Sequence, residues 1–165
     1  INKTMTRRET AINYFKQGYN CSQSVLLAFQ DLTGLTIEQS ALIASSFGGG
    51  MGKLREVCGA VSGMFMAIGL IKGYKDPTDL VSKTEHYKRV QELASKFKEQ
   101  NGSIICRELL SGEYSGRPPV SATEISSSTP PAKRTSEYYK KRPCAEMVGA
   151  AVRIFLTTLH NSTQQ

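Results

Sequence analysis

Apolar residues recur every three or four positions along most of the chain, which is the spacing of one face of an α-helix. No segment alternates between apolar and polar residues for long enough to predict a strand. The spacing predicts a helix over residues 6–16, a second helix after the N-cap residue Asn20, and a third after Thr36. A glycine-rich loop follows at residues 48–52. In the third helix, the residues expected to face inward are Ile37, Ala41 and Leu42.

The segment at residues 57–71 is apolar on every side, which is typical of a helix that is buried all round. The Asp-Pro-Thr-Asp run at residues 76–79 then predicts the start of a long helix, which Asn101-Gly102 ends. The inner face of the long helix is expected to carry Leu80, Tyr87, Val90, Ala94 and Phe97.

Two more helices are predicted in the second half of the chain. Ser103 is the expected cap of a short helix, and the final helix should begin near Pro143 and bury Val148, Val152, Phe155 and Leu156. We therefore predict an all-α fold, with residues 1–165 forming a single domain. Six or seven helices should form a bundle around the buried central helix at residues 57–71, and 165 residues are enough to enclose a core.

Residues 111–136 interrupt the helical pattern. They contain four of the six prolines and are rich in serine and threonine. This composition predicts a mobile loop or an insertion.

The composition is that of an ordinary globular protein, with 39% hydrophobic residues and a net charge of +7. Basic residues gather at residues 133–142, which we interpret as a solvated basic face. The first residues contain no apolar core of a secretory signal, and the longest apolar run is too short to span a bilayer. We expect no membrane association and a cytoplasmic location.

The four cysteines all fall where a helix is expected to begin. Cys21 follows Asn20, Cys58 opens the central helix, Cys106 follows the cap Ser103, and Cys144 follows Pro143. Free backbone N–H groups and the helix dipole stabilise a thiolate at such a position. The alternative is that each cysteine is an inert small apolar residue of the core.

Cys58 is the cysteine that we expect to be most reactive. Only small residues follow it, and the basic residues Lys53 and Arg55 precede it, although Glu56 opposes a lowered pKa. Gly59 and Gly63 lie on one face of the same helix, where they would let another backbone approach closely and leave room for a second sulfur or a bound group. Neither the P-loop pattern nor the dinucleotide-binding glycine pattern fits this stretch.

The cysteine pattern as a whole resembles the C_GCAxxG_C_C family of redox-active proteins. The resemblance rests on Cys21, the CGAVSG motif that begins at Cys58, and single cysteines at positions 106 and 144, and it extends to GYNCSQSVL at residues 18–26. The resemblance implies a small bacterial protein, and members of this family are assigned to redox chemistry mainly because of these cysteines. The segment at residues 112–138 departs from the resemblance, because a shorter connecting segment is expected at this place in the family.

Thiol–disulfide chemistry requires two of the cysteines to converge, one attacking and one resolving. The chain has no CxxC motif, so the fold must make the pair, and three pairings of four cysteines are open. Under this interpretation we expect no bound cofactor and an unidentified thiol or electron-transfer partner, and the protein is either an enzyme or a carrier.

The alternative is a zinc or iron–sulfur site made by Cys21, Cys58, Cys106 and Cys144. Separations of 37, 48 and 38 residues lack the local ligand pairs of zinc ribbons. A third hypothesis is a nucleic-acid-binding module that uses the basic stretch RTSEYYKKR at residues 134–142, but no nucleic-acid motif accompanies it.

Overall fold

The computed structural model describes residues 4–162 and is all-α, as predicted. The elements are α1 (Arg7–Lys16), α2 (Cys21–Leu27), α3 (Gln30–Thr33), α4 (Ile37–Ala44), a 3-10 helix η1 (Ser45–Phe47), α5 (Gly48–Met51), α6 (Gly59–Lys72), α7 (Leu80–Asn101), α8 (Cys106–Leu109), α9 (Ala122–Ile125), α10 (Ser136–Lys141) and α11 (Cys144–Ser162). Among the described residues, the only β-type pairing is an isolated antiparallel bridge between Val57 and Ile105.

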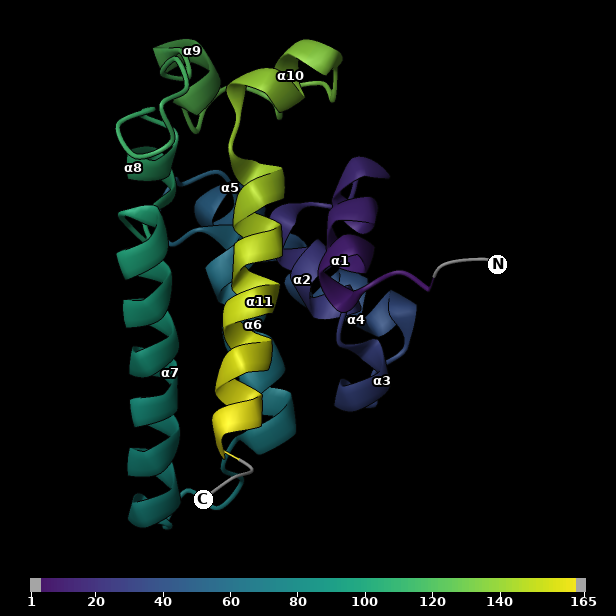
Figure 1. Cartoon of the computed structure of the whole chain (residues 1–165), viewed down its shortest axis with the longest axis vertical. Coiled ribbons are helices and arrows are strands. Elements are labelled where there is room, and N and C mark those ends of the chain that lie inside the picture. The colour runs from purple at the N-terminus through teal and green to yellow at the C-terminus, as the bar shows by residue number, and fades with distance from the viewer. Residues whose placement is uncertain (1–3, 163–165) are drawn as a thin grey trace.

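Two helices share the centre of the bundle. In Figure 1, α11 crosses in front of α6, the long helix α7 runs along one side, and α1 to α4 lie on the other. Helix α11 contacts α1, α2, α6 and α7, while α6 packs most extensively against α2. The segment at residues 111–136 lies with α8, α9 and α10 at the end of the bundle where α11 begins (Figure 1).

Side-chain caps explain where several helices begin. Asn20 caps α2 and Thr36 caps α4, as predicted, and each forms a capping box with a glutamine three residues later. The cap of the long helix α7 is Asp79, three residues after Asp76, and its carboxylate accepts a hydrogen bond from the Ser82 N–H at 3.0 Å. Asp76 instead accepts from the Thr78 N–H at 2.8 Å and shapes the preceding turn.

The central helix α6 is buried along its first half. All residues from 59 to 64 are buried, as are Ala67 and Ile68. Leu70, near its end, is 44% exposed, so the prediction that this segment is buried on every side is correct only for its first turns.

Two predicted inward faces are only partly correct, since Phe97 is buried as predicted but several of the other residues are exposed. In α4, Ile37 and Leu42 are 47% and 65% exposed, and the helix buries the smaller residues Ser40 and Ala44. In α7 the buried residues are Leu93 and Phe97, whereas Leu80 and Tyr87 are exposed. The start of α7 extends past the end of α11 in Figure 1, so none of the described helices covers its first turns.

No helix within residues 4–162 combines the length and the apolar character that crossing a membrane would require. The basic residues at 133–142 do not form one solvated face. Lys133, Lys140 and Lys141 are exposed, but Arg142 is buried and Arg134 is half-buried.

Helix α6 offers a matched pair of glycines for testing its contact with α2. A Cβ at Gly63 would lie 2.7 Å from the Ser22 carbonyl oxygen and 2.9 Å from the Val25 Cβ, whereas a Cβ at Gly69 would meet nothing within 4 Å. We expect Gly63→Ala to lower the free energy of unfolding by about 1–3 kcal/mol through overpacking. Gly69→Ala should raise it by about 0.5–1 kcal/mol, because alanine favours the helix.

Urea unfolding followed by circular dichroism measures both changes. Equal effects of the two substitutions would contradict a close approach of α2 to α6.

Candidate functional site: a cavity lined by four cysteines

All four cysteines line one cavity of about 70 Å³. They arrive from the starts of four helices that are far apart in sequence, α2, α6, α8 and α11. The four cysteines therefore come together at one cavity, while the approach of two of them within disulfide reach stays a prediction. All four are free thiols in this structure, so the disulfide pairing stays a prediction.

The predicted placement at helix starts is also confirmed. Cys21, Cys106 and Cys144 are the first residues of α2, α8 and α11, and Cys58 is the N-cap residue of α6. The cap of α8 differs from the prediction, since Ile105 occupies the cap position. The Ser103 hydroxyl accepts a hydrogen bond from the Ile105 N–H at 2.9 Å and so supports the turn that precedes Cys106.

The isolated bridge between Val57 and Ile105 directs Cys58 and Cys106 to the same face of the paired backbone. The Cys58 N–H donates to the Ile104 carbonyl at 2.8 Å, and the Cys106 N–H donates to the Glu56 carbonyl at 2.6 Å. These bonds flank the pair Val57 and Ile105. Because side chains alternate between the faces of extended backbone, the residues that follow this pair project to one face together.

Gly59 and Gly63 allow the first turn of α2 to touch α6. A Cβ at Gly59 would lie 2.4 Å from the Cys21 Sγ and 2.9 Å from the Phe47 carbonyl oxygen, so no side chain fits there while the sulfur keeps its place. The expectation that these glycines leave room for a second backbone and a second sulfur is confirmed. A role for either glycine in binding a cofactor stays a prediction.

The glycine-rich loop is a left-handed turn that shapes another wall of the cavity. Five consecutive residues, 49–53, have φ between 62° and 69°, and two of them, Met51 and Lys53, are not glycine. Such residues cost roughly 1–2 kcal/mol each in this conformation. A Cβ at Gly50 would lie 2.5 Å from the Cys106 Cβ, so this glycine is required for the turn to pack against α8.

Arg55 leaves the turn and enters the site. It is 6% exposed, and its Nη1 lies 3.7 Å from the Cys106 Sγ. Its other donors bind the carbonyl oxygens of Ile125 at 3.1 Å and Glu124 at 3.0 Å, both in α9. Among residues 4–162 no carboxylate lies within ion-pair distance of Arg55, so a nearly unpaired positive charge is held beside the thiols.

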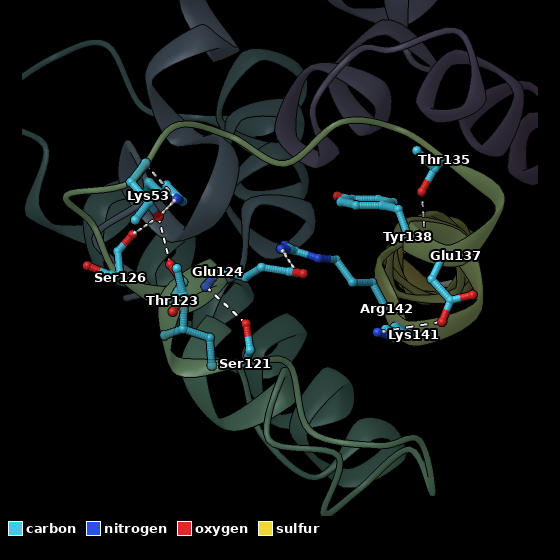
Figure 2. A network of polar contacts seen from close by, with 12 residues as sticks. Lys53, Ser121, Thr123, Glu124, Ser126, Thr135, Glu137, Tyr138, Lys141 and Arg142 are labelled. Atoms are coloured by element: carbon cyan, nitrogen blue, oxygen red, sulfur yellow. Dashed lines mark hydrogen bonds and ion pairs between the residues drawn. The ribbon is translucent and has the colours of Figure 1, made fainter.

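Two further arginines line the cavity, and their part in the site could not be seen in the sequence. Arg142 is 6% exposed, forms an ion pair with Glu124 at 3.0 Å and lies 4.7 Å from the centre of the Tyr138 ring. Figure 2 shows its side chain extending from the end of α10 toward Glu124. Arg134 donates to the Phe15 carbonyl at 2.8 Å and stacks over the Phe15 ring.

The only signal for these arginines was the local cluster of basic residues at 133–142, which we had interpreted as solvent-exposed. The contacts that bury Arg134 come from α1, more than one hundred residues away in the chain. They also give residues 111–136 a fixed set of partners. The predicted mobility of that segment stays a prediction.

The electrostatics of the site contradict the prediction of a reactive, low-pKa Cys58. Burial raises the pKa of the Cys58 thiol well above its ordinary value, and negative charge on Cys21, Cys106 or Cys144 raises it further. Burial likewise raises the pKa of Cys144 to about 12. A helix end supplies at most about 2 kcal/mol, or about one and a half pKa units, so desolvation outweighs it here.

Cys106 differs because it has a cation as its neighbour. Burial raises its pKa, but the hydrogen bond and the charge of Arg55 oppose that effect. Lys53, which the sequence placed beside Cys58, points away and donates to the Thr129 carbonyl at 2.6 Å. Of the two basic residues before Cys58, Arg55 therefore acts on Cys106 and Lys53 binds Thr129.

Within the described part of the chain, no group of three or more His, Cys, Asp or Glu side chains is arranged to hold a metal ion. The four thiols share a cavity without forming a set of metal ligands in this conformation. We derive no step through a metal, and the zinc or iron–sulfur alternative stays a prediction.

In a comparison with protein families, a family described as "Putative redox-active protein (C_GCAxxG_C_C)" matches residues 19–158. Searches among curated proteins and among solved structures gave no match to this chain. The matched region contains all four cysteines of the cavity and both glycines of the CGAVSG motif. The chain therefore belongs to the C_GCAxxG_C_C family.

Proposed function

We propose that the protein carries out thiol–disulfide exchange, in which Cys21 attacks and Cys58 resolves. The observation that supports this most is the convergence of four cysteines, from the starts of four helices, on one cavity that also contains buried arginines. Thiol–disulfide exchange needs an attacking thiolate and a second thiol within reach of the mixed disulfide.

Cys21 is the best candidate for the attacking sulfur. It is partly exposed, whereas Cys58 is buried. Negative charge on Cys21 raises the pKa of Cys58, Cys106 and Cys144, so Cys21 lies within electrostatic reach of all three. Burial keeps those three thiols protonated, so they are better suited to act after the first attack, when the mixed disulfide has formed.

Cys58 is the best candidate for the resolving sulfur, because Gly59 allows the Cys21 Sγ to lie against the residue that follows Cys58. Among the charges that act on Cys58, that of Cys21 has the largest effect. A buried thiol is also protected from direct attack by other molecules.

The reaction balances with a disulfide as the second reactant. The Cys21 thiolate attacks one sulfur of the incoming disulfide, whose S–S bond breaks, and the departing thiolate takes up a proton. Cys58 then attacks the Cys21 sulfur of the mixed disulfide and releases the second thiol. The protein loses two electrons and two protons, the incoming disulfide gains both, and each step is reversible.

We also propose a bacterial cytoplasm as the location, since four scattered cysteines in a chain of this length do not form a disulfide scaffold. The competing hypothesis of a zinc or iron–sulfur protein predicts a bound metal in the purified protein. Elemental analysis that finds about one metal site per chain, lost in each Cys→Ser variant, would favour that hypothesis over thiol exchange.

The pairing can be tested by oxidising the reduced protein with 2-hydroxyethyl disulfide and mapping the products by mass spectrometry. We expect a Cys21–Cys58 disulfide. Cys21→Ser should slow oxidation by at least about tenfold, and Cys58→Ser should leave the small thiol attached to Cys21. Cys144→Ser is the matched control and should oxidise at nearly the wild-type rate.

A product that joins Cys58 to Cys106, or an unchanged rate in Cys21→Ser, would contradict the assignment. Gly59→Ala should also slow closure of the disulfide, because its Cβ displaces the Cys21 sulfur, whereas Gly69→Ala in the same helix should not.

The raised pKa values predict how stability depends on pH. Above about pH 8.5 the unfolded chain loses thiol protons that the folded protein keeps, so the unfolded state binds fewer protons and stability falls as pH rises. The loss begins near the ordinary thiol pKa and continues toward the pKa of about 12 at Cys144. Each such thiol contributes a slope of up to about 1.4 kcal/mol per pH unit.

Urea unfolding of the reduced protein at several values between about pH 7 and pH 10 measures this slope. The slope should be smaller in Cys144→Ser than in the wild type. Identical slopes would show that the Cys144 thiol is not desolvated.

A further inference from the structure

We propose that a cationic cleft beside the cysteine cavity binds the substrate, and that the substrate is a small disulfide or thiol that carries carboxylate groups. This inference rests on the proposed thiol–disulfide function and adds the chemical class of the molecule that reacts. The cleft has a volume of about 450 Å³, within the range of about 300–1,000 Å³ that is usual for small-molecule sites.

The cleft and the cysteine cavity are adjacent. They share Asn20, Gly49, Arg55, Arg134, Tyr138 and Arg142 in their walls. Asn20 directly precedes Cys21 in the chain. A molecule held in the cleft therefore lies next to the wall that carries the proposed attacking sulfur.

The walls of the cleft carry an excess of positive charge. Lys53, Arg55, Arg134 and Arg142 all line it. Glu124 pairs with Arg142, but within residues 4–162 no carboxylate is in ion-pair distance of the other three. Partial desolvation and the charges of Arg55 and Arg142 lower the pKa of Lys53, which shows how close these cations lie to one another.

Hydrogen bonds fix these side chains in place before any ligand arrives. Lys53 donates to the Thr129 hydroxyl at 2.6 Å and to the Pro130 carbonyl at 3.0 Å, and Arg134 is held by carbonyl oxygens of Phe15 and Tyr19. Figure 2 shows Lys53 and Arg142 reaching the segment that includes α9 from opposite sides. Lys53 donates to three oxygens in all, so it acts on a ligand through its charge, which these bonds hold in place beforehand.

One donor in the cleft has no partner. The Nε of Arg142 is buried and makes no hydrogen bond within the described part of the chain, although its Nη2 binds Glu124. A buried donor without a partner costs about 1–3 kcal/mol, and a carboxylate oxygen of a ligand would satisfy it. This atom points to an anionic ligand independently of the overall charge.

Charge and chemistry together define the substrate. A molecule with two carboxylates would neutralise part of the excess charge, and a sulfur between them would lie at the wall that the cleft shares with the cysteine cavity. In the reaction, the S–S bond of this disulfide breaks and the Cys21–Cys58 disulfide forms. The two carboxylate-bearing thiols leave with the two protons. The reverse reaction reduces the protein with the same acidic thiol.

The test uses three small disulfides that differ in charge: 3,3′-dithiodipropionate, a dianion; 2-hydroxyethyl disulfide, which is neutral; and cystamine, a dication. Rates of oxidation of the reduced full chain are divided by the rates for free dithiothreitol, which corrects for intrinsic reactivity. We expect the dianion to react at least about tenfold faster than the dication, as electrostatic attraction in a charged cleft predicts.

Lys53→Gln should reduce this preference severalfold, and added salt should weaken it. Lys88→Gln removes the same charge from an exposed position on α7 and serves as the control, which should keep the wild-type preference. Equal corrected rates for the three disulfides, or equal effects of the two substitutions, would overturn the inference even if the protein is oxidised normally.

Calorimetric titration of Cys21→Ser with dithiodipropionate separates the two proposals. Binding that persists without oxidation in the wild type would support the cleft and contradict the thiol exchange. Oxidation without any preference for the dianion would contradict the cleft alone.

Discussion

The contact between the first turn of α2 and the first turns of α6 is the constraint on which the site depends. It exists because Gly59 and Gly63 present backbone in place of side chains, so that Cys21 and Ser22 lie directly against α6. Glycine inside a helix costs about 1 kcal/mol relative to alanine, and here that cost allows a sulfur to reach the cysteine cavity. The same principle applies at Gly50, where a left-handed turn passes close to Cys106.

Around this contact the protein combines two features that oppose each other electrostatically. Burial keeps Cys58 and Cys144 protonated, and it favours the neutral form of Cys106 as well. The nearby guanidinium groups favour negative charge, and Arg55 has only carbonyl and thiol partners. Such a site keeps Cys58, Cys106 and Cys144 neutral at rest and stabilises an anion when one forms or enters, which suits the proposed thiol–disulfide exchange.

Residues 111–136 connect the two features. Their composition predicted a loop, and the structure shows that backbone carbonyls of this segment bind Arg55 and Lys53, while Glu124 pairs with Arg142. Proline, serine and threonine form no packed core of their own, but their carbonyl and hydroxyl groups are good acceptors for buried cations. This segment therefore forms one wall of the proposed substrate cleft.

The helix starts could be predicted because they depend on neighbouring residues. Asn20 bonds to an N–H three residues away, so both the cap and the position of Cys21 follow from a short stretch of sequence. The pattern of four cysteines around CGAVSG likewise identified the family.

The reactivity of each sulfur could not be predicted, because burial depends on residues that are distant in the chain. Cys58 has favourable local neighbours, but its N–H bonds to Ile104 and its side chain is buried, while Arg55 and Arg134 reach partners 70 and 119 residues away. Desolvation and Coulomb forces act through space, and only the tertiary structure decides which groups they bring together.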